Sequence, residues 1–195
     1  MAALSIVLSF IKIYNAPLGG SVTLFSAAPI ILISFIHGPL YGLATGFIHS
    51  VVSLLLDLSL ASYIPDPVGI ILFILFDYIV PFTCYGLAGI FRNIKFSNNI
   101  KFNEFNKYIN LIIGTLFVCI IRFMCHFFTG IVVWNSITKA GEWNELVFQL
   151  SPAAYSAVYN AAYLVPDTIL LLVAVPALNY IYFVLNKYVL KRNIS

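Results

Sequence analysis

Long apolar runs separated by short polar breaks dominate the chain. The apolar runs lie near residues 2–14, 22–37, 40–56, 68–91, 108–134 and 152–186. A transmembrane helix needs about 20 mostly apolar residues, and several of these runs approach or exceed that length. The pattern therefore predicts an all-α integral membrane protein, with six transmembrane helices in a single membrane domain over residues 1–195.

The composition supports a membrane location. Hydrophobic residues make up 62% of the chain and charged residues only 9%, whereas soluble domains contain about 45–50% apolar and about 25% charged residues. The polar surface is therefore too small to cover a water-soluble body. The three cysteines lie inside apolar runs without metal-ligand spacing, so we expect neither a disulfide framework nor a metal site.

The distribution of basic residues predicts the orientation of the chain. Two groups stand out, Arg92, Lys95, Lys101 and Lys107 around the fourth connection, and Lys187, Lys191 and Arg192 near the C-terminus. The odd-numbered connections hold only Lys12 and Lys139. The positive-inside rule then places both termini in the cytoplasm. We expect the fourth connection, centred on Ser97-Asn98-Asn99, to be a polar cytoplasmic hinge, and the odd-numbered connections to face outward.

The first and last apolar runs are irregular. The first is short and meets Lys12 early, which fits neither a signal peptide nor a full crossing. We therefore expect the chain to start inside its first helix. The last run is longer than a bilayer core of about 30 Å requires. Pro166 and Pro176 are expected to kink this helix or to mark where it leaves the membrane.

The sequence offers little support for an enzyme. No G-x-x-x-x-G-K-[ST] motif occurs, so energy from ATP would have to come from other chains. A G-x-S-x-G elbow is absent too, and the adjacent Cys125 and His126 lie about 100° apart on a helix, which is poor geometry for a nucleophile and its base. We assign no catalytic residue and expect no nucleic-acid partner.

Ionisable and polar side chains at membrane depth are the strongest functional signal, because they are rare and costly there. Counted at 1.5 Å per residue from the outer ends of their helices, Asp77 lies about 13 Å deep, His126 about 12 Å and Arg122 about 18 Å. Tyr155 and Asn160 lie within about 12 Å of the outer start of the last helix. These positions converge on the outer half of the membrane.

A stripe of four residues follows one face of the fifth helix. Arg122, His126, Gly130 and Trp134 recur every four residues, so they share one face. Such a stripe can line a cavity. Gly130 could equally serve only to let a neighbouring helix approach.

The charged residues could also have purely structural roles. Asp77 could form an ion pair with Arg122 as a structural clamp. Asp167, next to Pro166, would most simply satisfy the backbone groups that the proline frees.

The residue types predict the ligand chemistry. A buried carboxylate, a tryptophan and several tyrosines favour a small, flat, cationic molecule, because aromatic faces and a carboxylate both attract a desolvated cation. Arg122 would either neutralise Asp77 in the empty site or hold a hydroxyl or phosphate group.

Three stretches give the chain a family resemblance: F-D-Y-I-V-P-F-T-C-Y-G-L-A-G-I-F at 76–91, R-F-M-C-H-F-F-T-G-I-V-V-W at 122–134 and Y-S-A-V-Y-N-A-A-Y-L-V-P at 155–166, with a looser match at 19–30. The chain resembles the thiamine-specific S component (ThiT or YuaJ family) of energy-coupling factor (ECF) transporters. The resemblance implies a six-helix S-component bundle in the bacterial plasma membrane that binds thiamine with high affinity and needs no cofactor. A transmembrane coupling protein and two ABC-type ATPases would be its partners.

The resemblance also implies roles for individual residues. Asp77 would face the thiazolium cation, with Tyr78 and His126 near the hydroxyethyl end. Trp134 and Tyr155 would flank the rings. Asn160 would hydrogen-bond the aminopyrimidine, and Arg122 occupies a basic position of the family. With Gly130 and the loop residue Tyr63, the predicted binding residues are Tyr63, Asp77, Tyr78, Arg122, His126, Gly130, Trp134, Tyr155 and Asn160.

Two outward connections, 57–67 and 135–150, could cover the pocket as lids or be ordinary surface loops. The chain also departs from the family pattern twice. The segment Gly20 to Leu24 lacks the acid that some members carry there. On the first helix, only Ala3 could belong to the A-x-x-x-A patch that meets the coupling protein.

Two other functions are therefore kept as alternatives. The chain could be an S component for another small ligand, such as the pyrimidine precursor of thiamine or a different vitamin. Alternatively, it could be an intramembrane enzyme that uses His126 and Asp77 as acid and base.

Overall fold

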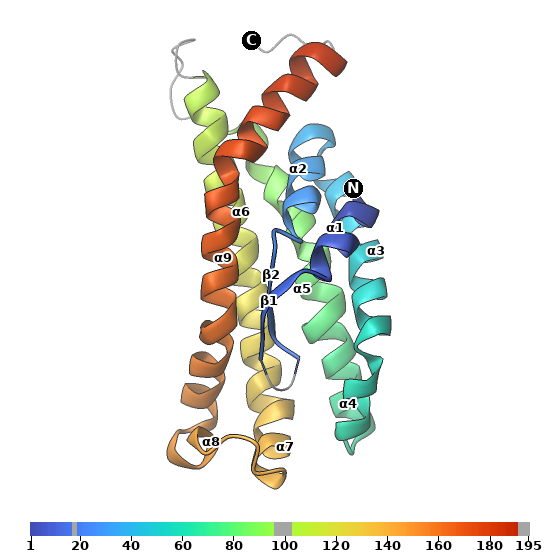
Figure 1. Ribbon diagram of the computed structural model, residues 1–195, viewed down its shortest axis with the longest axis vertical. Helices are drawn as coiled ribbons and strands as arrows, with labels where there is room; N and C mark the ends of the chain where they lie inside the picture. Colours follow the sequence, from blue (N-terminus) through green and yellow to red (C-terminus); the bar gives the residue numbers. More distant parts are fainter. Residues whose placement is uncertain (17–18, 96–102, 191–195) are drawn as a thin grey trace.

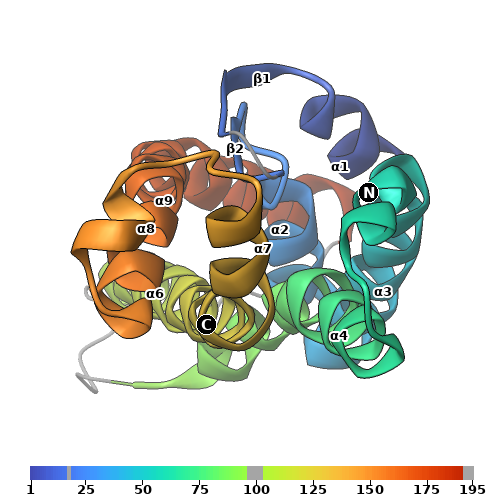
Figure 2. The ribbon, with the colours of Figure 1, turned by 90° about the horizontal axis from the view of Figure 1, so that it is seen from below.

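The computed structural model describes residues 1–16, 19–95 and 103–190. Long helices run along the main axis of the molecule, and a two-stranded ribbon lies against one side of them (Figure 1). Viewed along that axis, the ribbon lies between α9 and α1 (Figure 2). The predicted hinge at 97–99, with Lys101, Lys191 and Arg192, falls outside the described residues.

The N-terminal part differs from the prediction. The run at 2–14 forms a helix, α1, only over Ala2–Ser9, and the chain then continues as strand β1, Lys12–Asn15. This strand pairs antiparallel with β2, Ser21–Thr23. Helix α2 follows and spans only Ala28–His37. Periodicity cannot distinguish a short apolar helix from an apolar strand, and the ribbon satisfies its backbone groups by pairing.

A tight turn joins the second and third helices. Helix α3 spans Pro39–Leu56 and starts directly after α2. Gly38 joins the two with φ at 110°, in the left-handed region that favours glycine. A 3₁₀ helix, η1, follows α3 over Leu58–Tyr63.

The fourth apolar run forms one continuous helical rod whose winding changes along its length. It begins as α4, Pro67–Phe73, and passes through a π-helical turn, η2, at Ile74–Ile79. It continues as α5, Val80–Thr83, and ends as a 3₁₀ helix, η3, at Cys84–Asn93. The π-turn carries Asp77, and π-turns inside helices are frequent at functional sites.

The fifth run is also continuous. Helix α6, Asn103–Thr129, passes through a π-turn, η5, at Gly130–Trp134 into α7, Asn135–Ala140. The short helix α8, Leu146–Gln149, completes the connection to the last helix. Both long rods therefore carry a π-turn.

The last helix, α9, spans Pro152–Val184 and ends in a π-turn, η6, at Leu185–Val189. The Ser151 side chain caps its start by accepting a hydrogen bond from the Ala154 backbone N–H. Pro166 and Pro176 lie inside α9 without ending it. The end of α9 nearest the C-terminus inclines away from α6 (Figure 1).

Four of the described helical segments are long and apolar enough to cross a membrane: Pro39–Leu56, Pro67–Asn93, Phe105–Ala140 and Pro152–Val189. Helix Ala28–His37 is apolar but shorter, and α1 is about 12 Å long at 1.5 Å per residue. The chain is therefore a multi-pass helical membrane protein, in which the first two predicted spans are short helices. The orientation of its termini remains a prediction.

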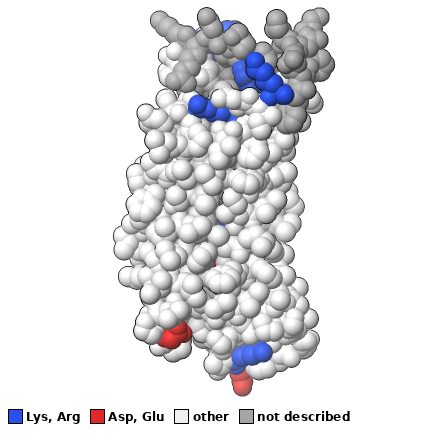
Figure 3. All heavy atoms as spheres, turned by 180° about the vertical axis from the view of Figure 1, so that it is seen from behind, with Lys and Arg blue, Asp and Glu red and all other residues white. Residues whose placement is uncertain are grey.

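On the face that Figure 3 shows, the charged side chains lie near the two ends of the molecule. A broad belt between the ends shows almost no charge on the visible face (Figure 3). The start of α6 and the end of α9 lie at one end of the molecule, while α7 and α8 lie at the opposite end (Figure 1). The connections 57–67 and 135–150, both predicted to face outward, thus lie at the end opposite the start of α6 and the end of α9.

The apolar core surrounds α2. Its most deeply buried members are Ile30, Ile31, Tyr85, Ala88, Val118, Leu171 and Val175. A Cβ atom on Gly86 would overlap the backbone of Leu43, so glycine lets η3 and α3 pack with their backbones in contact. This tightly packed half of the bundle supports the half that contains a cavity.

Candidate functional site

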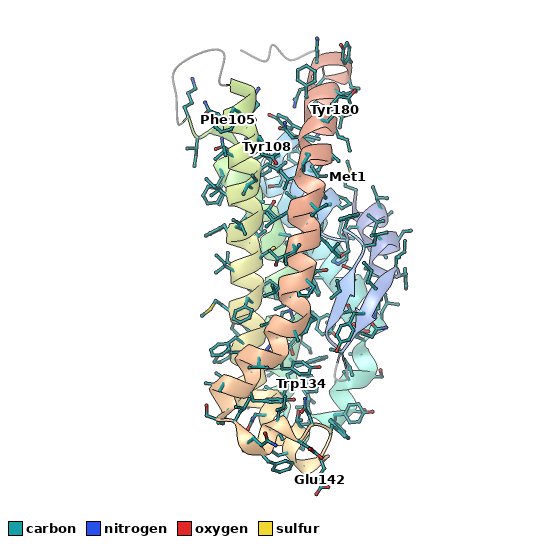
Figure 4. All side chains as sticks on the ribbon, turned by 60° about the vertical axis from the view of Figure 1, so that its left-hand side comes forward. Met1, Phe105, Tyr108, Trp134, Glu142 and Tyr180 are labelled. Carbon is teal, nitrogen blue, oxygen red and sulfur yellow. The ribbon has the colours of Figure 1, made fainter. Side chains whose placement is uncertain are left out.

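A cavity of about 330 Å³ lies within the bundle between the ribbon, α3, the rod that carries η2, α6 and α9. Trp134, on its wall, lies toward the end of the molecule that carries Glu142 (Figure 4). Eight of the nine predicted binding residues line this cavity: Asp77, Tyr78, Arg122, His126, Gly130, Trp134, Tyr155 and Asn160. The structure thus brings together residues that the sequence spreads over three helices.

Asp77 is the centre of a hydrogen-bond network on the cavity wall. It is only 8% exposed. Trp134 Nε1 donates to its Oδ2 at 2.7 Å, His126 Nδ1 lies 3.1 Å from its Oδ1, and the Thr129 hydroxyl donates to the same Oδ1. None of these partners carries a permanent positive charge, so the negative charge of Asp77 is hydrogen-bonded but not neutralised by them.

Arg122 forms its ion pair elsewhere. Its guanidinium lies 2.6 Å from Asp167 Oδ2 and donates to the Tyr85 hydroxyl at 2.7 Å. The Arg122–Asp77 clamp is therefore not formed. Asp77 lies at the level of His126 and Trp134, whereas Arg122 lies one helical turn or more deeper and faces α9.

Asp167 was expected to satisfy the backbone groups that Pro166 frees, and this prediction is wrong. Its Oδ1 accepts a hydrogen bond from the backbone N–H of Thr23 at 3.0 Å, and its Oδ2 pairs with Arg122. It thus joins α9 both to β2 and to α6, rather than satisfying its own helix. Only tertiary contacts decide between these roles, because both use the same carboxylate oxygens.

A second carboxylate, Asp57, lines the cavity. It is the C-terminal cap residue of α3, and its Oδ2 accepts a hydrogen bond from the Tyr78 hydroxyl at 3.1 Å. The sequence analysis placed Asp57 in the connection 57–67 and not among the binding residues. Its position directly after an apolar helix, at the end predicted to face outward, could have indicated a cavity residue.

Aromatic side chains form much of the remaining wall. Trp134 packs edge-on against Phe73, with ring centroids 5.8 Å apart. Tyr155, Tyr159 and Tyr163 follow one face of α9 with successive ring centroids 5.9 and 6.0 Å apart. Their spacing of four residues places all three on the cavity side.

Asn160 and Gly130 hold α9 against α6. Asn160 Nδ2 donates to the His126 backbone oxygen at 3.2 Å, and its Oδ1 accepts from the Tyr163 hydroxyl at 2.6 Å. A Cβ atom on Gly130 would overlap Ser156 Oγ. Gly130 therefore allows the close helix approach considered as its structural role, and it also lines the cavity.

Tyr63 lies apart from the other predicted residues. It is half exposed, does not line the cavity, and its ring packs edge-on against Trp143 with centroids 5.2 Å apart. This contact joins the two connections that are predicted to face outward, 57–67 and 135–150. Their role as lids, and a ligand contact by Tyr63, remain predictions.

Buried polar atoms near the cavity have no hydrogen-bond partner within the part of the chain that the structure describes. His126 Nε2 and the Tyr159 hydroxyl are the two most relevant. Because His126 Nδ1 faces a carboxylate oxygen, its proton lies on Nδ1 when the ring is neutral, and Nε2 is then an acceptor. Unpaired buried groups of this kind are costly unless a ligand or water satisfies them.

Fold and site together define a helical membrane protein that encloses a small-molecule cavity with an acidic and aromatic wall. Residues 1–187 match the family model described as thiamine transporter protein (Thia_YuaJ). The chain belongs to this family, which confirms the resemblance found in the sequence. It is a thiamine-specific S component and not an enzyme.

Two of the proteins that are similar to the chain show the relationship. The thiamine transporter ThiT of Bacillus subtilis (strain 168) is 28% identical over 173 residues, covering 87% of this chain and 81% of the relative. A solved structure of ThiT from Listeria monocytogenes superposes with a TM-score of 0.64 at 20% identity, over 97% of this chain and 91% of that one. The second likeness establishes the shared fold.

Proposed function

We propose that this chain binds thiamine in the cavity from the outer side of the bacterial plasma membrane and passes it to an ECF transport complex. Asp77 is the observation that carries the proposal. Its buried carboxylate faces the cavity without a Lys or Arg partner in the described chain, since the nearby Arg122 is held by Asp167. A desolvated carboxylate of this kind favours a cationic ligand such as a thiazolium ring.

The aromatic wall supports the same ligand. Trp134 is oriented by its hydrogen bond to Asp77, so the ring and the charge that would meet a thiazolium are held together. Tyr155 is buried beside the same cavity. We assign these two rings to the faces of the heterocycles, where cation–π contacts contribute up to about 2 kcal/mol when dry.

Polar groups of the ligand would form hydrogen bonds with cavity atoms that have a free acceptor position. The acceptor His126 Nε2, together with Tyr78, suits the hydroxyl of the hydroxyethyl group. Asn160 Oδ1 accepts one hydrogen bond from Tyr163 and keeps a second lone pair. That lone pair suits the amino group of the pyrimidine.

Energy for uptake would come from partner chains. No nucleotide-binding motif occurs in the 195 residues. We propose a transmembrane coupling protein and two ABC-type ATPases as partners, with α1 as one contact. Leu4 and Val7 on that helix are more than half exposed, and Ala3 is exposed beside them.

The cavity wall also suits a second small ligand. The segment Gly20 to Leu24 contributes Gly20, Ser21 and Thr23 to the cavity wall and no acid. A pyrimidine precursor of thiamine would use the same aromatic wall but would not need the charge of Asp77.

Two measurements test the proposal. Mass spectrometry of the ligand that co-purifies with the detergent-solubilised protein should find thiamine, and calorimetry should then show saturable thiamine binding. In liposomes the chain alone should not accumulate thiamine, while ATP should drive uptake once the coupling protein and ATPases are added. Concentrative uptake by the isolated chain would contradict the role as a subunit.

A further inference from the structure

The charges around the cavity are unevenly placed. Asp57 and Asp77 line it together with Lys12 and Arg122. Arg122 is engaged by Asp167 behind the wall, and Lys12 lies on β1, whose residues are all exposed. Within the described chain, neither Asp57 nor Asp77 forms an ion pair with a Lys or Arg, including the cavity-lining Lys12.

Asp57 occupies a special position among these groups. It caps the C-terminal end of α3, where the helix dipole contributes a partial negative charge of about one half. Figure 1 shows α3 running down to the end of the molecule where α4 begins and α7 lies. The carboxylate and the helix end therefore add their negative potentials at one corner of the cavity.

The Tyr78 hydroxyl links this corner to the site of the proposed cation. It donates to Asp57 Oδ2, and Tyr78 directly follows Asp77 in the π-turn. A ligand held by Asp77 therefore has Asp57 as a near neighbour across one tyrosine ring. Any negatively charged group attached to such a ligand would meet an unneutralised carboxylate on this side.

We propose that Asp57, reinforced by the C-terminal end of α3, is a specificity-determining residue that makes the cavity reject anionic forms of its ligand. This inference rests on the proposed function, since it takes thiamine as the ligand. The cavity would then prefer the unphosphorylated cation over its phosphate esters. The hydroxyl of Tyr78 fixes the carboxylate in place, and the negative charge performs the discrimination.

Calorimetry with thiamine and thiamine monophosphate on the purified chain tests the proposal. The wild type should bind the monophosphate more weakly than thiamine. Asp57→Asn removes the charge but keeps an oxygen for Tyr78, so the ratio of the two dissociation constants should fall by about tenfold, the scale of one charge at close range. Tyr78→Phe keeps the Asp57 charge, so it should keep most of the ratio even where the loss of its hydroxyl weakens the binding of both compounds.

Two controls keep the outcomes separate. Glu142→Gln removes an exposed acid at the same end of the molecule, away from the cavity lining (Figure 4), and should leave the ratio unchanged. Asp57→Ser provides a second neutral variant should Asp57→Asn fail to fold, and its binding of thiamine reports the folded state. An unchanged ratio in both folded Asp57 variants would overturn the inference, as would equal binding of both compounds by the wild type. Absence of thiamine binding by the wild type would instead overturn the proposed function.

Discussion

Asp77 and Asp167 are both carboxylates buried at membrane depth, with exposed fractions of 8% and 3%, yet their surroundings differ. Asp167 has a guanidinium partner and a backbone N–H, and it does not line the cavity. Asp77 has a histidine, a threonine and a tryptophan, and it does line the cavity. One region neutralises its charge, while the other leaves the charge facing an enclosed space.

The difference separates architecture from binding. Asp167 belongs to a buried ion pair that also holds a strand. Loss of either partner of such a pair leaves an uncompensated buried charge and destabilises the fold. A buried carboxylate without a cation is costly until a cation arrives. The depth of a charge in the membrane therefore does not reveal its role, whereas its partners do.

Asp167→Asn should have the largest effect, and on stability. It leaves the Arg122 charge buried without a counter-charge, which costs about 3–5 kcal/mol for a broken buried pair. Thermal unfolding in detergent should show a clearly lower midpoint. The double change Arg122→Met with Asp167→Leu should recover much of the loss, because an apolar replacement of a buried pair is often neutral. A single Asp167 variant with normal stability but lost binding would place Asp167 among the ligand contacts.

Asp77→Asn should have the next largest effect, and on affinity. Shape and hydrogen-bonding atoms are kept while the counter-charge is lost, so thiamine binding should weaken by about 1.5–3 kcal/mol, the range for hydrogen bonds to charged groups. Calorimetry on the purified variant measures this change. Asp77→Glu keeps the charge and is the matched control, expected to bind more tightly than the asparagine variant. Unchanged affinity in Asp77→Asn would show that Asp77, like Asp167, has a structural role.

Trp134→Phe should affect both affinity and fluorescence. Thiamine stacked on Trp134 should quench its emission, because an electron-poor heterocycle accepts an electron from excited indole. The variant should lose the quench and up to about 2 kcal/mol of binding. Trp143→Phe is the control, since the only other tryptophan of the chain contacts Tyr63 outside the cavity. A quench that disappears with Trp143 instead would show that the outer connections report the ligand.

Tyr63→Ala should have the smallest effect. It removes the edge-on contact with Trp143, which is worth about 0.5–1.5 kcal/mol for an aromatic pair. Dissociation of thiamine, followed by stopped-flow fluorescence, should become faster if the joined connections cover the cavity. Unchanged release would identify them as ordinary surface loops.

Much of the site could be predicted from the sequence. Residues four apart on a helix must share a face, so the stripe from Arg122 to Trp134 lines one cavity in the structure as expected. The long apolar runs after residue 38 likewise form helices, because a helix satisfies its backbone groups within one segment in lipid. The family resemblance was carried by the same segments and is confirmed by the family match.

The N-terminal segment shows where local pattern fails. Residues 2–14 and 22–37 were predicted as spans, but the chain forms two short helices around a ribbon. Helix and strand can both bury a short apolar run. The choice depends on which partner is available for the backbone, here the second strand of the ribbon.

The membrane class, the helical rods and the residues that share the cavity face follow from composition and from the geometry of a single helix, while the family is carried by the resemblance of whole segments and by the family match. The pairing of Arg122 with Asp167 rather than with Asp77 and the position of Asp57 in the cavity wall are visible in the folded bundle alone. Contacts between helices depend on their rotation and depth relative to one another. Packing of the whole bundle sets those quantities, and no local pattern along the chain encodes them.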